Sequence, residues 1–193
     1  MSSITINYLT CEYHENPLGI DVPQPDLSWQ IQSDQRGAYQ TAYQLLVAAS
    51  ESDLTGGREL LWDTGKVETA QSIHVAYEGP TLVSGQRVYW KVRVWNEAGL
   101  ETESPTAWWE MGLLDSGDWQ ADWITPDWDE DSARPHPAPL LRRQVAVQGE
   151  LAGARLYATS LGLYELWLNG RRVGDAVLTP GWTSYDHRLQ YQA

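Results

Sequence analysis

Seven side chains of mixed chemistry lie close together between residues 167 and 186. Three are aromatic and four are polar or charged: Trp167, Trp182, Tyr185, Asn169, Arg171, Asp175 and Asp186. Indole and phenol rings stack on the apolar C–H faces of sugars, and fixed polar groups orient the sugar hydroxyls. The mixture indicates a sugar-facing rim, for which we single out Trp182, Tyr185, Asn169, Arg171 and Asp175. A purely structural role, the commoner one for such residues, would place Trp167 in a core and pack Trp182 and Tyr185 across a turn.

Four carboxylates follow one another closely at Asp127, Asp129, Glu130 and Asp131. An acid–base pair or a calcium ion would each use such oxygens. The segment is flanked by prolines and has neither the spacing nor the glycine of a calcium-binding loop. We therefore expect these groups to be solvated.

Other catalytic chemistries find no signature in the sequence. The histidines, at positions 14, 74, 136 and 187, share no metal-ligand spacing, and Cys11 has no identifiable base partner. The sequence also lacks a nucleophile elbow and a glycine-rich phosphate loop. We therefore expect no catalytic residue, no metal and no cofactor.

Composition narrows the classes of partner. The chain has 193 residues with 42% hydrophobic content, and its net charge is −13. So acidic a chain lacks the basic face that nucleic acids and anionic membranes require. We see no signal peptide, no apolar run near the ~20 residues of a membrane span and no possible intrachain disulfide, because Cys11 is the single cysteine. We therefore expect a cytoplasmic protein that binds neither nucleic acid nor membrane.

The element that organises the chain is the strand expected over residues 88–96, VYWKVRVWN. Its apolar and charged residues alternate with period two, which is typical of a half-buried strand. Six further strands are expected over 4–9, 27–31, 40–50, 61–64, 72–77 and 107–114, although a helix stays possible for 40–50. This spacing predicts an all-β sandwich of the fibronectin type III or immunoglobulin-like class over residues 1–114.

The composition changes after this sandwich. Residues 115–133 contain seven carboxylates and neither Lys nor Arg, and three tryptophans interrupt the segment. We interpret residues 115–139 as an interdomain strap, and expect its acidic groups to pair with Lys91 and Arg93.

A second set of strands is expected beyond the strap, over 140–147, 154–158 and 162–169, with a hairpin at Asn169-Gly170. Residues 140–193 are therefore expected to be part of a second β-sandwich. About 55 residues bury too little surface to be comfortably stable alone, so we expect the chain to be the N-terminal portion of something longer.

Several stretches, in this order, carry a resemblance to a known family. They are YLTCEYHENPLGIDVPQPDLSW, AYQLLVAAS, LWDTGKV, VYWKVRVWNEAG, DWQADWI and LGLYELWLNGRRVGDAVLTPGWTSYDHRLQY. Together they resemble the N-terminal region of bacterial-type α-L-rhamnosidases. The resemblance implies a fibronectin type III-like domain followed by the start of a jelly-roll domain related to carbohydrate-binding modules.

The resemblance also implies a parent enzyme, a glycoside hydrolase that removes terminal α-L-rhamnose with inversion. Its catalytic carboxylates lie in a later (α/α)6 barrel, so no catalytic residue is carried over and these 193 residues are expected to be inactive alone. The implied role is that of an accessory region, with the downstream catalytic domain and rhamnose-containing glycans as partners. An autonomous carbohydrate-binding module and a protein-interaction sandwich stay open as alternatives.

Overall fold

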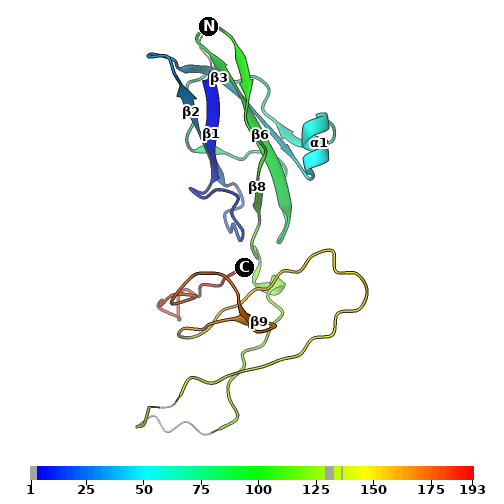
Figure 1. Cartoon of the computed structure of the whole chain (residues 1–193), viewed down its shortest axis with the longest axis vertical. Helices are drawn as coiled ribbons and strands as arrows, with labels where there is room; N and C mark the ends of the chain where they lie inside the picture. Colours follow the sequence, from blue (N-terminus) through cyan, green and yellow to red (C-terminus); the bar gives the residue numbers. More distant parts are fainter. Residues whose placement is uncertain (1–3, 129–132, 136) are drawn as a thin grey trace. The chain divides into compact units, whose positions relative to one another are not determined.

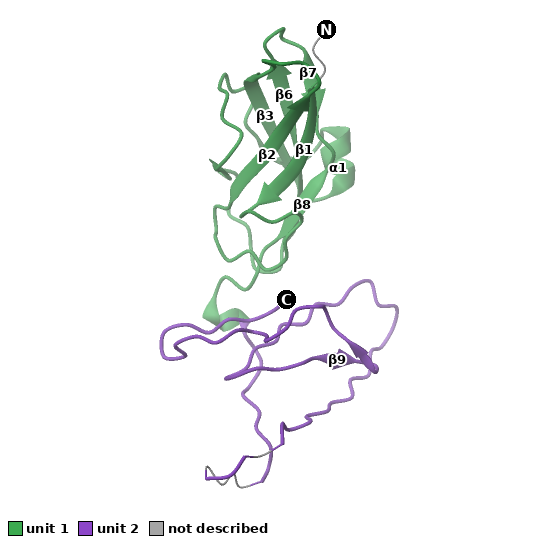
Figure 2. Cartoon of the chain, turned by 60° about the vertical axis from the view of Figure 1, so that its left-hand side comes forward, with its two compact units in different colours: residues 1–118 green, residues 119–193 purple. Residues whose placement is uncertain are grey.

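The chain divides into two compact units, residues 1–118 and 119–193 (Figure 2). The structure is a computed structural model that describes residues 4–128, 133–135 and 137–193. In this described part of the chain, none of the helices has the length and apolar character needed to cross a bilayer. The expected domain boundaries at residues 114 and 139 stay predictions.

The first unit is an immunoglobulin-like sandwich of two antiparallel sheets (Figure 1). One sheet has the order β1–β2–β5, with bounds Ile4–Cys11, Asp26–Ser33 and Val75–Ala76. The other has the order β4–β3–β6–β7, with bounds Leu60–Asp63, Gln40–Ala48, Arg87–Asn96 and Glu101–Glu103, and β8 (Ala107–Glu110) also pairs with β6. The all-β class expected from strand spacing is confirmed.

Strand β6 is the centre of the larger sheet, because β3 pairs along one edge and β7 and β8 share the other. Its residues Trp90, Val92 and Val94 are fully buried between the sheets, as the period-two pattern predicts. Burying one large apolar side chain contributes about 1.5–3 kcal/mol. This strand therefore anchors the core of the unit.

Two buried indoles in this core differ in their hydrogen bonding. Trp29 Nε1 donates to Gln40 Oε1 at 2.9 Å. The Gln40 amide nitrogen donates in turn to the carbonyl oxygens of Gln71 at 2.7 Å and Thr69 at 3.2 Å. Trp109 Nε1 is buried and has no acceptor among the described residues. Gln40 therefore connects β2, β3 and the loop after β4 through one buried side chain.

The edge of β6 is interrupted between β7 and β8, where Pro105 cannot donate a backbone hydrogen bond. Ser104 bridges the interruption. Its backbone N–H donates to Val92 O at 2.9 Å, and its hydroxyl accepts from Val92 N at 3.0 Å. A side chain thus completes the ladder where the backbone of the edge strand turns away.

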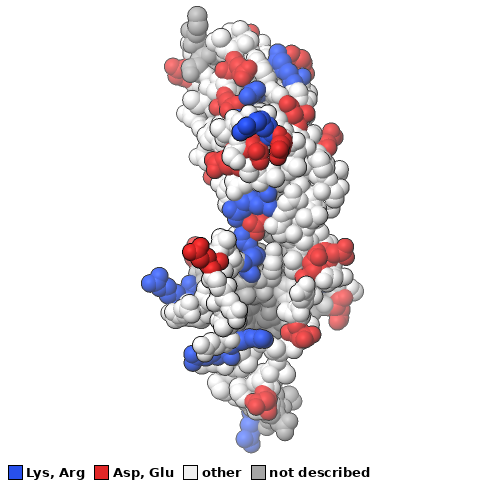
Figure 3. Space-filling view, turned by 90° about the vertical axis from the view of Figure 1, so that its right-hand side faces the viewer, with Lys and Arg blue, Asp and Glu red and all other residues white. Residues whose placement is uncertain are grey.

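The charged face of β6 corrects one expectation. Lys91 Nζ lies 2.9 Å from Glu103 Oε1, and Arg93 Nε lies 2.8 Å from Glu103 Oε2 and 3.6 Å from Glu101 Oε1. Pairing with the acidic segment that begins at Asp115 was therefore wrong, because the adjacent antiparallel strand β7 places Glu103 directly across from Arg93 and within reach of Lys91. Burial acts to raise the pKa of Glu103, but the hydrogen bonds from the two cations prevail and hold it below its ordinary value. On the face that Figure 3 shows, basic side chains lie among acidic ones.

Residues 40–48 form strand β3, so the helix considered for residues 40–50 does not occur there. A short helix that the sequence pattern did not predict, α1 (Glu51–Gly56), follows it. Ser50 caps this helix by accepting a hydrogen bond from Asp53 N at 3.1 Å. Leu54 is buried against the outer face of β3, where it forms a second small apolar cluster. The outward residues of β3 are therefore covered as well as its inward ones.

The strand expected over 72–77 is confined to β5. His74 has a φ of 52°, a left-handed conformation that turns the backbone just before the strand. Ile73 is consequently exposed, whereas Val75 and Tyr77 are buried. The prediction that all three apolar residues share one face was wrong for Ile73.

The end of β8 is bonded on both sides. Pro17 O accepts from Glu110 N at 3.0 Å, Ile20 N donates to Glu110 O at 3.1 Å, and Gly112 N donates to Ile20 O at 2.7 Å. On the other side, Met111 N donates to the backbone oxygen of Gln86, directly before β6, at 2.9 Å. The loop after β1 therefore extends the sheet beside the last strand of the unit.

The second unit has little regular structure. Within its described residues the strands are β9 (Trp167–Leu168) and β10 (Arg171–Arg172), and Pro180 is the one buried residue. The strands expected over 140–147 and 154–158 are wrong, apart from an isolated bridge between Ala158 and Gln192. Alternating apolar residues form a strand only where a neighbour accepts their backbone hydrogen bonds, and these segments have no ladder partner in the described part of the chain.

Candidate functional site

The β9–β10 hairpin positions two of the five predicted site residues. Asn169 and Gly170 form its two-residue turn with φ values of 50° and 79°, which suit Asn-Gly in a turn of this kind. Leu168 pairs with Arg171 across the turn. The hairpin predicted from the Asn-Gly pair is thus present, and it leaves the side chains of Asn169 and Arg171 exposed to solvent.

Asp175 lies in the turn that follows this hairpin, and its carboxylate is exposed. The turn is held by Arg172, whose Nη2 donates to Ala176 O at 2.7 Å and lies 3.9 Å from Glu165 Oε1. Asp175 itself has no polar partner among the described residues. Its carboxylate is therefore available to accept hydrogen bonds from a ligand.

The two aromatic candidates form a separate ring pair. The centroids of Trp182 and Tyr185 are 6.0 Å apart with an interplanar angle of 46°. Tyr185 Oη accepts from Gly162 N at 2.8 Å, which fixes the phenol ring, while Trp182 is 78% exposed. The indole therefore presents a free face of the type that stacks on sugars, although the pair also fits the structural role of packing across a turn.

The five predicted residues thus fall into two groups, the ring pair and the hairpin residues. Within the described part of residues 119–193, no hydrogen bond, ion pair or ring contact joins one group to the other. A single rim that contains all five residues stays a prediction.

Trp167 does not lie in a core, although a core position was considered for it. It is 59% exposed, because β9 and β10 pair only with each other and none of the described residues covers the ladder. Placing Trp167 in a core was therefore wrong. The signal that could have shown this is the brevity of the ladder, since two short strands enclose no interior.

The acidic and nucleophilic candidates do not assemble into a reactive centre in the described residues. Asp127 is exposed, and Asp129, Glu130, Asp131 and His136 lie outside the described residues. No group of three potential metal ligands forms among the residues that are described. Cys11 is buried, and burial raises the pKa of its thiol, so the reactive thiolate is strongly disfavoured.

Comparison with known protein families gives two matches along the chain. The model described as "Rha78A-like, N-terminal immunoglobulin domain" matches residues 6–115. The model described as "Alpha-L-rhamnosidase N-terminal domain" matches residues 149–193. The two matches occupy the two units of the structure.

Individual relatives extend this similarity. An α-L-rhamnosidase of Formosa agariphila is 36% identical over 186 residues, which cover 93% of this chain and 20% of that protein. The solved α-L-rhamnosidase from Dictyoglumus thermophilum has a TM-score of 0.85 at 34% identity and covers 97% of this chain and 23% of its own. The Streptomyces avermitilis α-L-rhamnosidase complexed with L-rhamnose has a TM-score of 0.60 at 39% identity, with 64% of this chain and 12% of that chain covered. The chain spans about a fifth of the length of the curated relatives it matches.

Proposed function

Because the chain belongs to the family of Rha78A-like N-terminal immunoglobulin domains, we propose that it serves as the non-catalytic accessory region of an α-L-rhamnosidase. The observation that carries the proposal is the succession of an immunoglobulin match and a rhamnosidase N-terminal match in one chain. The parent protein would be a glycoside hydrolase that removes terminal α-L-rhamnosyl residues from glycosides with inversion.

Inverting hydrolysis requires a general acid and a general base held about 6.5–9.5 Å apart on either side of the sugar. The described residues of this chain supply no such pair in an enclosed cleft, so the acid and base would belong to a catalytic domain of the parent. The role of this region would be to brace that domain. The first unit suits such a role, because its core is closed by two sheets and the cations of β6 are paired with carboxylates of β7.

The exposed side chains of the second unit support the catalytic domain as its partner. They include a run of large apolar residues on both sides of the hairpin: Leu140, Val145, Val147, Leu151, Leu156, Leu161, Leu163, Leu168, Val177 and Leu178. Apolar surface of this extent is typical of an interface with another part of a protein. We infer that this surface packs against further segments of the parent chain.

Hydrolysis of p-nitrophenyl α-L-rhamnopyranoside tests the non-catalytic role. The 193-residue chain alone should release nitrophenol no faster than buffer, and robust turnover would contradict the proposal. The reading frame beyond codon 193 tests the parent. A frame that continues into a helical barrel supports an α-L-rhamnosidase, whereas a stop codon directly after Ala193 would overturn it.

A second candidate function is that of an autonomous carbohydrate-binding module, which the exposed ring of Trp182 favours. Titration calorimetry with L-rhamnose should then give saturable heat that the Trp182→Ala variant loses. Absence of saturable heat, or heat that the Trp182→Ala variant retains in full, would contradict this candidate.

A further inference from the structure

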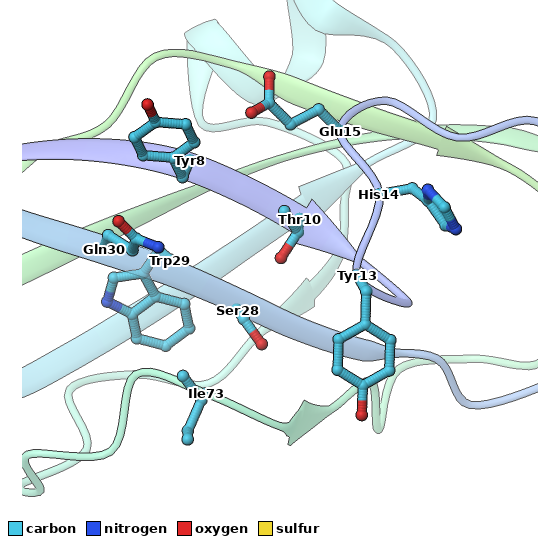
Figure 4. A pocket seen from close by; sticks show the side chains of 9 residues that line it. All are labelled: Tyr8, Thr10, Tyr13, His14, Glu15, Ser28, Trp29, Gln30 and Ile73. Atoms are coloured by element: carbon cyan, nitrogen blue, oxygen red, sulfur yellow. The ribbon is translucent and has the colours of Figure 1, made fainter.

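A shallow hollow of about 390 Å³ lies on the outer face of the β1–β2 sheet, in the first unit (Figure 4). Rings and hydroxyls line it from three segments that are distant in the sequence: Tyr8 and Thr10 on β1, Tyr13 in the loop after it, Ser28 and Gln30 on β2, and Ile73 before β5. The strand pattern gave no indication of this hollow. Its volume falls within the range of small-ligand sites, about 300–1,000 Å³.

The aromatic side chains of the hollow are exposed by an unusual backbone. Tyr8 has a φ of 50° at the β-bulge between Asn7 and Thr10, and Tyr13 has a φ of 68°. The two tyrosines are 62% and 73% exposed, so neither ring contributes to the core. Left-handed backbone is unfavourable for residues that carry a side chain, and such residues concentrate at functional sites. The bulge therefore holds a phenol ring in solvent at an energetic cost.

His74 is a third left-handed residue beside the hollow, with a φ of 52°. Its ring meets Tyr13 edge to face at 5.5 Å between centroids, and its backbone N–H donates to Ser28 Oγ at 3.1 Å. These two contacts connect the segment directly before β5 to both Tyr13 and β2. The ring of Tyr13 therefore has an aromatic contact on one edge while most of its surface stays open to a ligand.

The floor between the rings is polar. Thr10 and Ser28 are cross-strand partners, and Figure 4 shows them between Tyr8 at one end and Tyr13 at the other. The Ser28 hydroxyl accepts a bond from His74, so its own hydrogen is free to donate. Among the described residues, the Thr10 hydroxyl and the Gln30 side-chain amide have no hydrogen-bond partner. Three polar groups are thus directed at one space of sugar size.

The charges around the hollow select the class of ligand. Its lining residues include Glu15 and His14 but neither Lys nor Arg. An anionic ligand would find no countercharge there, and the chain as a whole carries a net charge of −13. A neutral polyol with an apolar face fits both the rings and the unpaired hydroxyls.

We propose that this hollow binds one pyranose unit of a neutral glycan, with its C–H face against Tyr13 or Tyr8 and its hydroxyls on Thr10, Ser28 and Gln30. The site goes beyond the accessory function and is distinct from the ring pair of the second unit. It would give the immunoglobulin-like unit a sugar contact of its own.

Amide chemical shifts of the ¹⁵N-labelled 193-residue chain provide the test, with methyl α-L-rhamnopyranoside and methyl α-D-glucopyranoside as probes. The proposal expects saturable shifts at the amides of Thr10, Ser28 and Gln30 with at least one pyranoside, and a dissociation constant of about 1–30 mM for a ligand of this size. Absence of shifts at these amides with both probes at about 100 mM would overturn it.

Variants separate the hollow from other surfaces. Tyr13→Ala should weaken binding about fivefold, as loss of one aromatic contact predicts. Tyr39→Ala removes a tyrosine that is 56% exposed outside the hollow and should leave binding unchanged. If Tyr13→Ala does not fold, Thr10→Val removes one hydroxyl at nearly constant volume and should weaken binding instead.

A further control distinguishes this proposal from the second candidate function. Trp182→Ala should leave the shifts at the hollow unchanged. Shifts confined to residues 162–185 would support the second candidate function and overturn the hollow. Shifts at Thr10 and Ser28 that persist unchanged in both Tyr13→Ala and Thr10→Val would also overturn it.

Discussion

Replacing Trp29 by Phe should destabilise the first unit more than replacing Trp109 by Phe. Both indoles are fully buried, and each substitution removes the same atoms from the same core. They differ in one respect, because Trp29 Nε1 donates to Gln40 Oε1 at 2.9 Å whereas Trp109 Nε1 has no acceptor among the described residues. The pair of variants therefore isolates the hydrogen bond from the loss of volume.

The magnitude follows from the state of Gln40 in the variant. Trp29→Phe leaves Gln40 Oε1 buried without its donor, and an unsatisfied buried polar group costs about 1–3 kcal/mol. Trp109→Phe leaves no acceptor unsatisfied. We expect the free energy of unfolding to fall by about 1–3 kcal/mol more in Trp29→Phe than in Trp109→Phe.

Urea unfolding followed by far-ultraviolet circular dichroism measures this difference, because the described strands lie mainly in the first unit. With a slope of about 1–3 kcal/mol per molar urea, the two midpoints should differ by about 1 M. The double variant Trp29→Phe/Gln40→Leu completes a double-mutant cycle with the two single variants. The losses in free energy of unfolding of the single variants should differ from that of the double variant by about 1 kcal/mol or more when summed. Equal midpoints for the two Phe variants, together with additivity in the cycle, would refute the reasoning.

Three further predictions concern the same unit. The pKa of Glu103 is lowered in the folded protein, so its ion pairs stabilise the fold at pH values above the ordinary pKa of 4.5. This stabilisation is lost as the pH falls through the pKa of the folded state. The urea midpoint of the wild type should therefore drop more steeply below about pH 4.5 than the midpoint of Glu103→Gln. Cys11, buried with a raised thiol pKa, should react with Ellman's reagent only in denaturant; prompt labelling of the native chain would contradict this. Ser104→Ala should lower the free energy of unfolding by about 1–3 kcal/mol in thermal or urea unfolding, because a buried backbone N–H of β6 loses its acceptor, whereas Ser116→Ala, at an exposed position in the short 3-10 helix Ser116–Asp118, should change it little.

The sandwich could be predicted because its strands carry strong local patterns. Alternation in Trp90, Val92 and Val94 places one face inward wherever the strand lies in the sheet. Helix α1 was missed although Ser50 and Asp53 have the spacing of an N-terminal cap, since six residues give no helical periodicity. The partner of Lys91 depended on which strand lies next to β6, and that is a property of topology rather than of local sequence.

The candidate sites show the same division. The hairpin at Asn169-Gly170 is determined by the two turn residues themselves, so the sequence predicted it correctly. The hollow depends on a bulge at Tyr8 and on a contact between Ser28 and His74, which are 46 positions apart. Neither feature has a signature in a local window. In the second unit, alternation predicted strands over 140–147 that need a pairing neighbour to form.

The bonding around the end of β8 has a mechanical consequence. This strand is the last strand of the first unit, so a load applied through that end of the unit is transmitted along β8. The bonds to β6 on one side, and those of Pro17, Ile20 and Gly112 on the other, run across the strand direction. Such bonds are sheared together rather than opened one after another. We therefore expect the first unit to resist extension from its C-terminal end.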